Sequence, residues 1–267
     1  GYTIQPYSPA AGTGLSSHEL NMPGAYKEVK DTTVVALFKV IKHDQSSFLF
    51  DDPNEDVRIA AWTTTPWTLP SNTALCAGPD ISYIKIKTSN PYTHTPVSVV
   101  LAEALVPNWF GGKNQSTVEG QSAAFKGSKM KGIRYEPLLD FGNEIEPLLG
   151  GTDAYLVLTG DHVTTSDGTG IVHTAPSFGA DDQRVAKANG VGTLTLVDQT
   201  GKFKENVGPY SGRYVKDYKD EPGYVAVDID IAIQLKTEGK ALNVQKYEHN
   251  YPHCWRTDKP VLYYPLD

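Results

Sequence analysis

The sequence predicts a mixed α/β fold that is mainly β, built as a single domain with short helices on its flanks. Strand-like runs outnumber helical segments along the 267 residues. The 24 glycines and 18 prolines are spread through the chain, so no linker divides it. A hydrophobic content of 39% is compatible with a substantial core. These three observations favour one domain over two domains joined by a linker.

Strands are expected where β-branched and aromatic residues are frequent, or where apolar and polar residues alternate. The alternation is clearest at 84–87, where Ile84 and Ile86 alternate with Lys85 and Lys87. The predicted strands are 33–41, 57–62, 81–87, 98–102, 154–158, 169–173, 193–197 and 243–247. Short helices are predicted at 102–109, 181–189 and 228–238, the last two closed by Gly190 and Gly239.

The two ends of the chain have a different character. Residues 1–30 are rich in Pro, Gly, Ser and Tyr, which predicts an irregular ribbon with a helix start at Ser16 or Ser17. Residues 248–267 contain further prolines and show no clear period. Both ends are therefore predicted to be irregular segments.

Composition excludes several classes of protein. A net charge of -7 argues against wrapping duplex nucleic acid, and the densest basic stretch, 126–134, is best explained as a solvated face. No apolar run approaches the roughly 20 residues that cross a bilayer, so no membrane segment is expected. Two cysteines, Cys76 and Cys254, favour a reduced, cytoplasmic compartment, with one disulfide between them left open. His249, His253 and Cys254 lack a fourth ligand at suitable spacing, so no metal site is expected.

The segment 61–72 concentrates hydroxyls and indoles around two prolines. Threonine side chains donate and accept hydrogen bonds, tryptophans offer broad apolar faces, and prolines stiffen the backbone. Together they suit a small amphiphilic ligand, although a strand that runs into a proline turn explains the composition equally well. The residues concerned are Trp62, Thr63, Thr64, Thr65, Pro66, Trp67, Thr68 and Pro70.

The segment 167–184 has the layout of a polar site. It runs from a glycine turn through a short apolar strand and a proline turn into a helix that starts with Asp181 and Asp182. Its Gly-Thr-Gly triplet lacks a third glycine and precedes the strand, so a nucleotide-binding loop is rejected. One carboxylate suffices to cap the helix, and the second is available for a cation such as an α-amino group. Without further context, His173 is more often a core residue than a catalyst.

The sequences WTTTPWTLPSN at 62–72 and GTGIVHTAPSFGADD at 168–182 resemble the editing domain of isoleucyl-tRNA synthetase, a class I aminoacyl-tRNA synthetase. Further similar segments are YSPAAGTGLSSHE at 7–19 and HNYPHCWRTDKP at 249–260, and they suggest the eukaryotic cytosolic type. The resemblance implies a β-barrel-like core. It also implies that 1–267 is a single editing domain excised from a larger synthetase, with about 1–30 and 248–267 leading to the parent catalytic domain. The ATP-binding motifs of that catalytic domain are not found, so no cofactor is expected here.

The resemblance also implies roles for individual residues. Asp182 would bind the α-ammonium group of the misattached amino acid, and Asp181 would cap the helix. His173 would line the amino-acid pocket and set its size limit. Thr68 and Asn72 would shape the pocket or contact the terminal adenosine. The pocket itself would be formed by Thr63, Thr64, Thr65 and Trp67.

The implied reaction is hydrolysis of the ester in Val-tRNA(Ile), with Ile-tRNA(Ile) rejected. One methylene is worth only about 0.8 kcal/mol, so a second pocket that excludes isoleucine by overpacking is needed. No strong nucleophile is apparent. A positioned water is therefore expected to attack, with the threonine loop donating to the oxyanion and the vicinal hydroxyl of the tRNA assisting proton transfer.

Other interpretations stay open. The domain could bind the aminoacylated tRNA end or brace the synthetase without catalysis, or it could be an editing domain of the valyl or leucyl type. The expected partners are the 3′ end of tRNA(Ile) carrying valine and the rest of the synthetase, and the isolated domain is expected to be monomeric.

Overall fold

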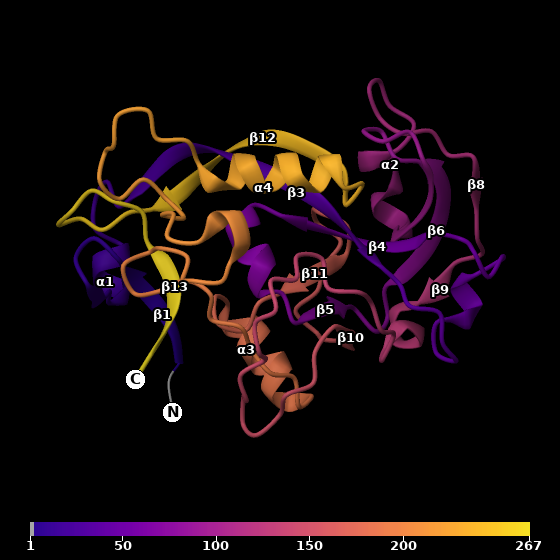
Figure 1. Ribbon diagram of the computed structural model, residues 1–267, viewed down its shortest axis with the longest axis horizontal. Coiled ribbons are helices and arrows are strands. Elements are labelled where there is room, and N and C mark those ends of the chain that lie inside the picture. Colours follow the sequence, from indigo (N-terminus) through magenta and orange to yellow (C-terminus); the bar gives the residue numbers. More distant parts are fainter. Residues whose placement is uncertain (1–2) are drawn as a thin grey trace.

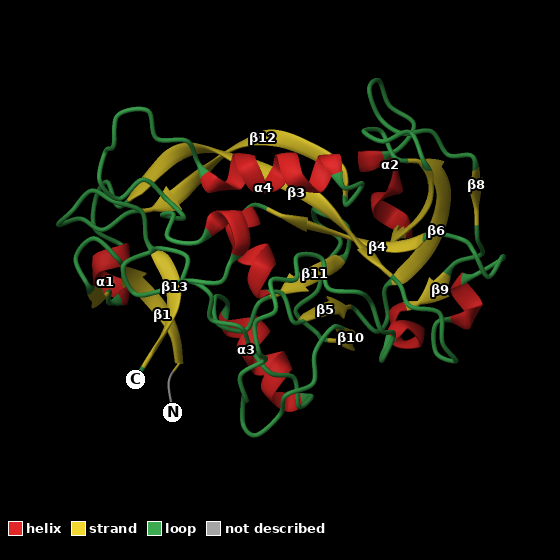
Figure 2. Cartoon of the chain, in the orientation of Figure 1, coloured by secondary structure: helices red, strands yellow, loops and turns green. Residues whose placement is uncertain are grey.

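Residues 3–267, the part of the chain that the computed structural model describes, form three β-sheets surrounded by short helices (Figures 1 and 2). The seven-stranded sheet has the order β12-β3-β4-β7-β6-β8, with β9 paired to β6. Two three-stranded sheets have the orders β10-β5-β11 and β13-β1-β2. The predicted mainly β fold with short flanking helices is confirmed. No closed barrel forms in this part of the chain, because the large sheet ends in two strands, β12 and β8, that do not pair with each other.

The strands are β1 (Thr3–Ser8), β2 (Thr13–Gly14), β3 (Tyr26–Lys39), β4 (Val57–Thr63), β5 (Ala74–Ala77), β6 (Ser82–Ser89), β7 (Pro96–Ala102), β8 (Gly120–Gln121), β9 (Phe125–Lys126), β10 (Leu156–Thr159), β11 (Ile171–Thr174), β12 (Ala241–Pro252) and β13 (Leu262–Leu266). The α-helices are α1 (Ser17–Leu20), α2 (Val106–Trp109), α3 (Ala180–Ala188) and α4 (Val227–Thr237). Short 3-10 helices are η1 (Ser47–Leu49), η2 (Pro66–Ser71), η3 (Glu103–Leu105), η4 (Gly127–Met130) and η5 (Gly208–Tyr210).

Strands β3 and β12 form a long antiparallel arm, paired from Tyr26 opposite Pro252 to Ala36 opposite Ala241. Its outer half is partly exposed, whereas residues 32–38 are buried. In that inner half Phe38 packs in one hydrophobic cluster and Leu37 in another, because successive side chains of a strand point to opposite faces. The central sheet is therefore covered on both faces at this point.

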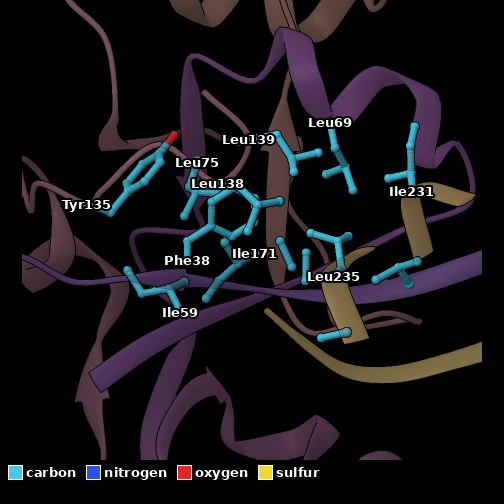
Figure 3. Packing of buried hydrophobic residues seen from close by; sticks show 14 of the residues in the cluster. Phe38, Ile59, Leu69, Leu75, Tyr135, Leu138, Leu139, Ile171, Ile231 and Leu235 are labelled. Carbon is cyan, nitrogen blue, oxygen red and sulfur yellow. The ribbon is translucent and has the colours of Figure 1, made fainter. Parts of the chain in front are cut away.

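The main hydrophobic core joins the central sheet to η2 and α4. Figure 3 shows Phe38 and Ile59 of the sheet near Ile171, with Leu69 of η2 and Leu235 of α4 on the other side of the cluster. All five side chains are almost completely buried. Because η2 contributes to this core, the turn between β4 and η2 is held against the sheet.

Both ends of the chain contain regular structure, which corrects the prediction that 1–30 and 248–267 are irregular. Strand β1 pairs with β13, from Thr3 opposite Leu266 to Tyr7 opposite Leu262. The helix start at Ser16 is confirmed as a capping box, since the Ser16 hydroxyl accepts from the Glu19 N–H and the Glu19 carboxylate accepts from the Ser16 N–H. The strand pairing was invisible in the sequence because each strand finds its partner at the opposite end of the chain.

Three other predictions differ from the structure. Segment 193–197 makes only isolated bridges, at Thr193 and Val197, and is not a strand. Segment 102–109 is divided between η3 and α2, with Pro107 in the first turn of α2. Strand β5 was missed because it has only four residues and begins three residues after the end of the proline-containing helix η2. Helices 181–189 and 228–238 are confirmed as α3 and α4, each shifted by one residue.

Within residues 3–267, no helix combines the length and the apolarity needed to cross a membrane. The same residues contain no group of three or more His, Cys, Asp or Glu side chains arranged to hold a metal ion. Cys76 and Cys254 are both buried and unpaired.

Candidate active site

A cavity of about 300 Å³ lies between the threonine run and the segment that contains β11 and the start of α3. The sheet β10-β5-β11 brings these segments together: His173 of β11 pairs with Leu75 of β5, three residues after Asn72. The cavity is lined by Trp62, Thr63, Thr64, Thr65, Thr68, His162, Thr164, Asp167, Gly168, Thr169, Gly170, Ile171, Val172, His173, Ala175, Phe178 and Asp182. The two stretches singled out in the sequence are therefore opposite walls of one cavity.

The threonines of this wall have different hydrogen-bonding roles. The Thr65 N–H donates to the Thr63 hydroxyl at 3.0 Å, and the Thr65 hydroxyl lies 3.3 Å from those of both Thr63 and Thr68. Thr64 also lines the cavity, and its hydroxyl makes no hydrogen bond with any residue in 3–267. Thr64 is thus the hydroxyl of the run that is available to a ligand, while its neighbours hold the turn in shape.

Asn72 fixes the protonation of the His173 ring. Its Nδ2 donates to the Ala74 carbonyl at 2.9 Å and lies 2.9 Å from His173 Nδ1, while its Oδ1 accepts from the Tyr135 hydroxyl at 2.6 Å. A flipped amide would place its oxygen against the Ala74 carbonyl oxygen, and two acceptors repel each other. The amide is therefore oriented with Nδ2 toward His173, and the ring carries its proton on Nε2.

The proton on His173 Nε2 points to Thr68. Nε2 donates to Thr68 Oγ1 at 2.9 Å, and the Thr68 hydroxyl donates in turn to the Thr65 carbonyl at 2.9 Å. Burial lowers the pKa of His173 to about 4, so the ring is neutral at physiological pH. Because both ring nitrogens are engaged in hydrogen bonds and the ring is neutral, His173 forms a fixed part of the cavity wall and is not placed to act as a general acid or base.

Asp182 is one of the two carboxylates that line the cavity, and the other, Asp167, is exposed. Asp182 is partly buried in the first turn of α3, and its Oδ2 accepts from the Ala175 N–H at 3.0 Å. The side chain lies over Gly179, where an added Cβ would come within 2.9 Å of Oδ2. Burial raises the pKa of Asp182 to about 7 against the opposing effect of the Ala175 N–H, and Asp181 adds to the rise. Such a carboxylate gains most from a bound cation, which stabilises its ionised form.

Asp181 is not the helix cap that the resemblance implied. Helix α3 begins at Ala180, its N-cap is Gly179, and no side chain caps it. Asp181 is exposed and forms an ion pair with Arg184 at 3.3 Å. Its carboxylate still lies in the first turn, where negative charge is favourable to the helix dipole.

Trp67 and Asn72 do not line this cavity. Trp67 is 3% exposed, and its ring packs edge-on against Phe178 with centroids 5.1 Å apart. Asn72 is also 3% exposed and has no path to a ligand in the cavity. The structure places Thr63, Thr64, Thr65, Thr68, His173 and Asp182 together, with Trp67 and Asn72 behind them as support.

A buried ion cluster supports the start of η2. The Trp67 N–H donates to Asp228 Oδ1 at 2.8 Å, and Lys216 Nζ lies 4.0 Å from Asp228 and 3.3 Å from Asp31. Burial raises the pKa of Asp228 to about 6, and nearby Lys216 opposes that rise. The cluster therefore connects α4 to the turn that carries the threonines.

Sequence reasoning missed several cavity residues. Trp62 was noticed for its apolar face but not assigned to the site, and Asp167 was taken only as part of a glycine turn. His162, Thr164 and Phe178 were not singled out. Gly168 and Gly170 both have positive φ, at 70° and 78°, so the Gly-Thr-Gly triplet makes a left-handed turn at the cavity. The only indication in the sequence was that most of these residues lie within or next to the segment 167–184.

No threonine hydroxyl of the cavity is hydrogen-bonded to a histidine that could act as its base. His173 donates through Nε2 to Thr68 while its Nδ1 is engaged by Asn72, and the ring of His162, which also lines the cavity, makes no hydrogen bond to any residue in 3–267. Cys76 lies in β5, outside the cavity lining, and burial raises its pKa to about 12. The arrangement offers two carboxylates, the unbonded Thr64 hydroxyl and the neutral His173 ring around a space for a small ligand.

The fold is that of a synthetase editing domain. The leucyl-tRNA synthetase editing domain of P. knowlesi matches 85% of this chain and 98% of its own length, with a TM-score of 0.54 at 13% sequence identity. This similarity concerns the fold alone. No family model matches the sequence.

The chain's relatives are isoleucine–tRNA ligases. It is 45% identical to the enzyme of Porphyromonas gingivalis and 46% identical to that of Cytophaga hutchinsonii, in each case over 100% of this chain and 26% of the relative. The enzyme of Treponema denticola is 40% identical over 98% of this chain. The chain thus spans about a quarter of the length of these relatives. All three are bacterial, so the expected eukaryotic cytosolic type is not supported.

Proposed function

We propose that this chain is the editing domain of an isoleucyl-tRNA synthetase and hydrolyses the ester of Val-tRNA(Ile) while sparing Ile-tRNA(Ile). Similarity over the whole of this chain to about a quarter of each isoleucine–tRNA ligase supports the assignment to the isoleucine system. The main structural support for this reaction is that Asp182 and the threonine run line the same small cavity. The catalytic domain that uses ATP would lie in the rest of the synthetase, and the site would act in the cytoplasm.

Asp182 binds the α-ammonium group of the aminoacyl ester. A raised pKa of about 7 means that the free site is about half ionised at neutral pH. A bound ammonium group stabilises the carboxylate and completes a charge-assisted hydrogen bond. An anchored ammonium group would hold the ester carbonyl, two bonds away, next to the threonines.

Water performs the attack on the ester carbonyl. The free Thr64 hydroxyl donates to the developing oxyanion, whereas Thr63 and Thr65 keep the turn rigid through their mutual hydrogen bonds. His173 supplies no proton, so the proton from water passes to solvent or to the vicinal hydroxyl of the terminal ribose. The rate gain comes mainly from positioning an ester that is already reactive.

His173 sets the size limit. Its ring is held at both nitrogens, so it cannot rotate away from a larger side chain without breaking hydrogen bonds to Thr68 and Asn72. Overpacking a closed site costs typically about 1–3 kcal/mol, which is enough to exclude isoleucine where a missing methylene is not.

The deciding experiment measures deacylation of Val-tRNA(Ile) and Ile-tRNA(Ile) by this chain and by the full synthetase. We expect the valyl ester to be hydrolysed and the isoleucyl ester to be spared. A non-catalytic binding module would bind both RNAs and hydrolyse neither. A domain of the valyl or leucyl type would instead prefer esters on tRNA(Val) or tRNA(Leu).

A further inference from the structure

A second cavity, of about 310 Å³, lies next to the proposed active site. The two cavities share Trp62, Asp167 and Gly168 in their linings, so the Trp62 ring and the 167–168 turn separate them. The proposed hydrolysis does not use the second cavity. The residues that line the second cavity indicate what kind of chemical group would bind in it.

Aromatic rings form a large part of this lining. The Trp109 ring is held in place by its Nε1–H, which donates to the Gly168 carbonyl at 2.8 Å. Trp62 and Tyr247 meet edge to face, with centroids 5.6 Å apart at 85°. All three side chains are partly exposed. Fixed, partly exposed rings of this kind offer faces on which a planar ligand stacks.

Primary amides complete the lining. The side chains of Asn108, Asn243 and Gln245 line the cavity, and within residues 3–267 none of them makes a hydrogen bond. Gln115, by contrast, is committed to the Asn108 carbonyl and the Gly112 N–H. Each free amide offers both donors and an acceptor, which is the pattern needed to pair with the edge of a nucleobase.

The charge of the cavity argues for a base and against a phosphate. Asp167 is the charged residue of the lining, and no Lys or Arg among residues 3–267 belongs to it. A phosphate would be repelled by this carboxylate and would find no cation. The exocyclic amine of adenine or cytosine, in contrast, is a donor that a carboxylate accepts.

We propose that this second cavity binds a base of the single-stranded RNA end, on the nucleotide next to the esterified one. The proposal rests on the function proposed above. The ester must stay with Asp182 and the threonines on one side of Trp62, so the esterified nucleotide occupies the junction. The strand then continues past Gly168 into the second cavity, where its neighbouring base stacks on Trp109 and Tyr247.

The test compares two substrates in the full synthetase: valyl-tRNA and a valyl ester of a single nucleoside. Trp109→Ala should lower kcat/KM for valyl-tRNA about 10-fold, through KM, because stacking of one base on an aromatic ring is worth about that factor. It should leave hydrolysis of the nucleoside ester unchanged. Trp109→Phe, which keeps a ring, should restore most of the loss.

Two further variants serve as a control and as an independent test of the second cavity. Trp255→Ala removes an exposed tryptophan that does not line the cavity and should change neither rate. The double variant Asn243→Ala/Gln245→Ala removes amides without touching the aromatic packing, and should weaken valyl-tRNA alone by a few fold. An equal loss on both substrates, or no loss on either, would overturn the proposal.

If the proposed hydrolysis is wrong, the results differ from those expected when only the base site is wrong. In that case the wild-type protein hydrolyses neither substrate, and binding of uncharged tRNA becomes the readout. Trp109→Ala should still weaken that binding about 10-fold. If it does not, the base site is wrong irrespective of the reaction.

Discussion

The carboxylate of Asp182 gives the sharpest prediction. Asp182→Asn keeps the size of the side chain and removes the charge. Asn also retains an oxygen that can accept from the Ala175 N–H, so the start of α3 should be preserved. The substitution therefore removes the proposed ammonium partner with little other change.

The expected size of the effect follows from the cost of removing one partner of a charge pair. Losing one member of a partly buried charge pair costs about 2 kcal/mol or more, so kcat/KM for Val-tRNA(Ile) should fall at least about 30-fold. In the wild type, activity should decline about tenfold per pH unit below the Asp182 pKa of about 7, because the protonated acid does not bind ammonium. Activity should also fall above roughly pH 8, where the α-amino group loses its proton.

The raised pKa of Asp182 also predicts how the free energy of unfolding changes with pH. The folded-state pKa of Asp182 is raised from 3.8 to about 7, so its stabilising contribution is present below pH 3.8 and is lost as pH rises through 7. Above pH 7 the buried charge destabilises the fold, and Asp182→Asn should then raise the free energy of unfolding. We expect about 1–2 kcal/mol, which is well below the full conversion because the carboxylate is partly exposed to solvent in the cavity.

The assay is the rate of deacylation between pH 5.5 and 8.5, corrected for spontaneous hydrolysis, with urea unfolding at pH 3.5 and pH 8. The acid limb should be present in the wild type and absent in Asp182→Asn. A variant that keeps the wild-type rate, or keeps the same acid limb, would show that another group binds the ammonium.

Three further outcomes are expected. His173→Ala should open the size limit and raise hydrolysis of Ile-tRNA(Ile) about tenfold, and unchanged sparing of that ester would remove histidine from the sieve. Gly179→Ala should displace the Asp182 carboxylate, whose Oδ2 lies 2.9 Å from the new Cβ, and reduce activity, whereas Gly120→Ala meets nothing closer than 3.6 Å and serves as its control. Lys216→Met leaves the buried Asp228 carboxylate without its lysine, whereas Asp31 keeps His249 as a partner, and should lower the free energy of unfolding by about 3–5 kcal/mol, read from urea titration; a stable variant would show that the cluster is not needed.

Much of the candidate site was accessible from the sequence because its residues are close neighbours along the chain. Thr63, Thr64 and Thr65 are consecutive, and Asp182 lies in the first turn of a helix whose position is indicated by its early acidic residues and by the glycine that follows it. Strands such as β4 and β11 were predicted within one or two residues, because β-branched and aromatic runs report a buried sheet well.

The sequence misassigned side chains whose role depends on which way they face. Trp67 has the composition of a pocket wall, yet its ring is buried against Phe178. Trp62, five residues earlier, was left out of the site and separates two cavities. Both rings sit near a turn between a strand and a 3-10 helix, where neither period of two nor period of 3.6 applies.

By itself, the sequence determined that this chain builds a mainly β domain with a threonine-rich turn and a helix-borne carboxylate. Tertiary structure alone decided that Asn72 orients His173, because that hydrogen bond joins residues 101 positions apart. It also decided that the two ends of the chain share one sheet. Local patterns report propensity and periodicity, whereas hydrogen bonds and packing between distant segments exist only once the chain has folded.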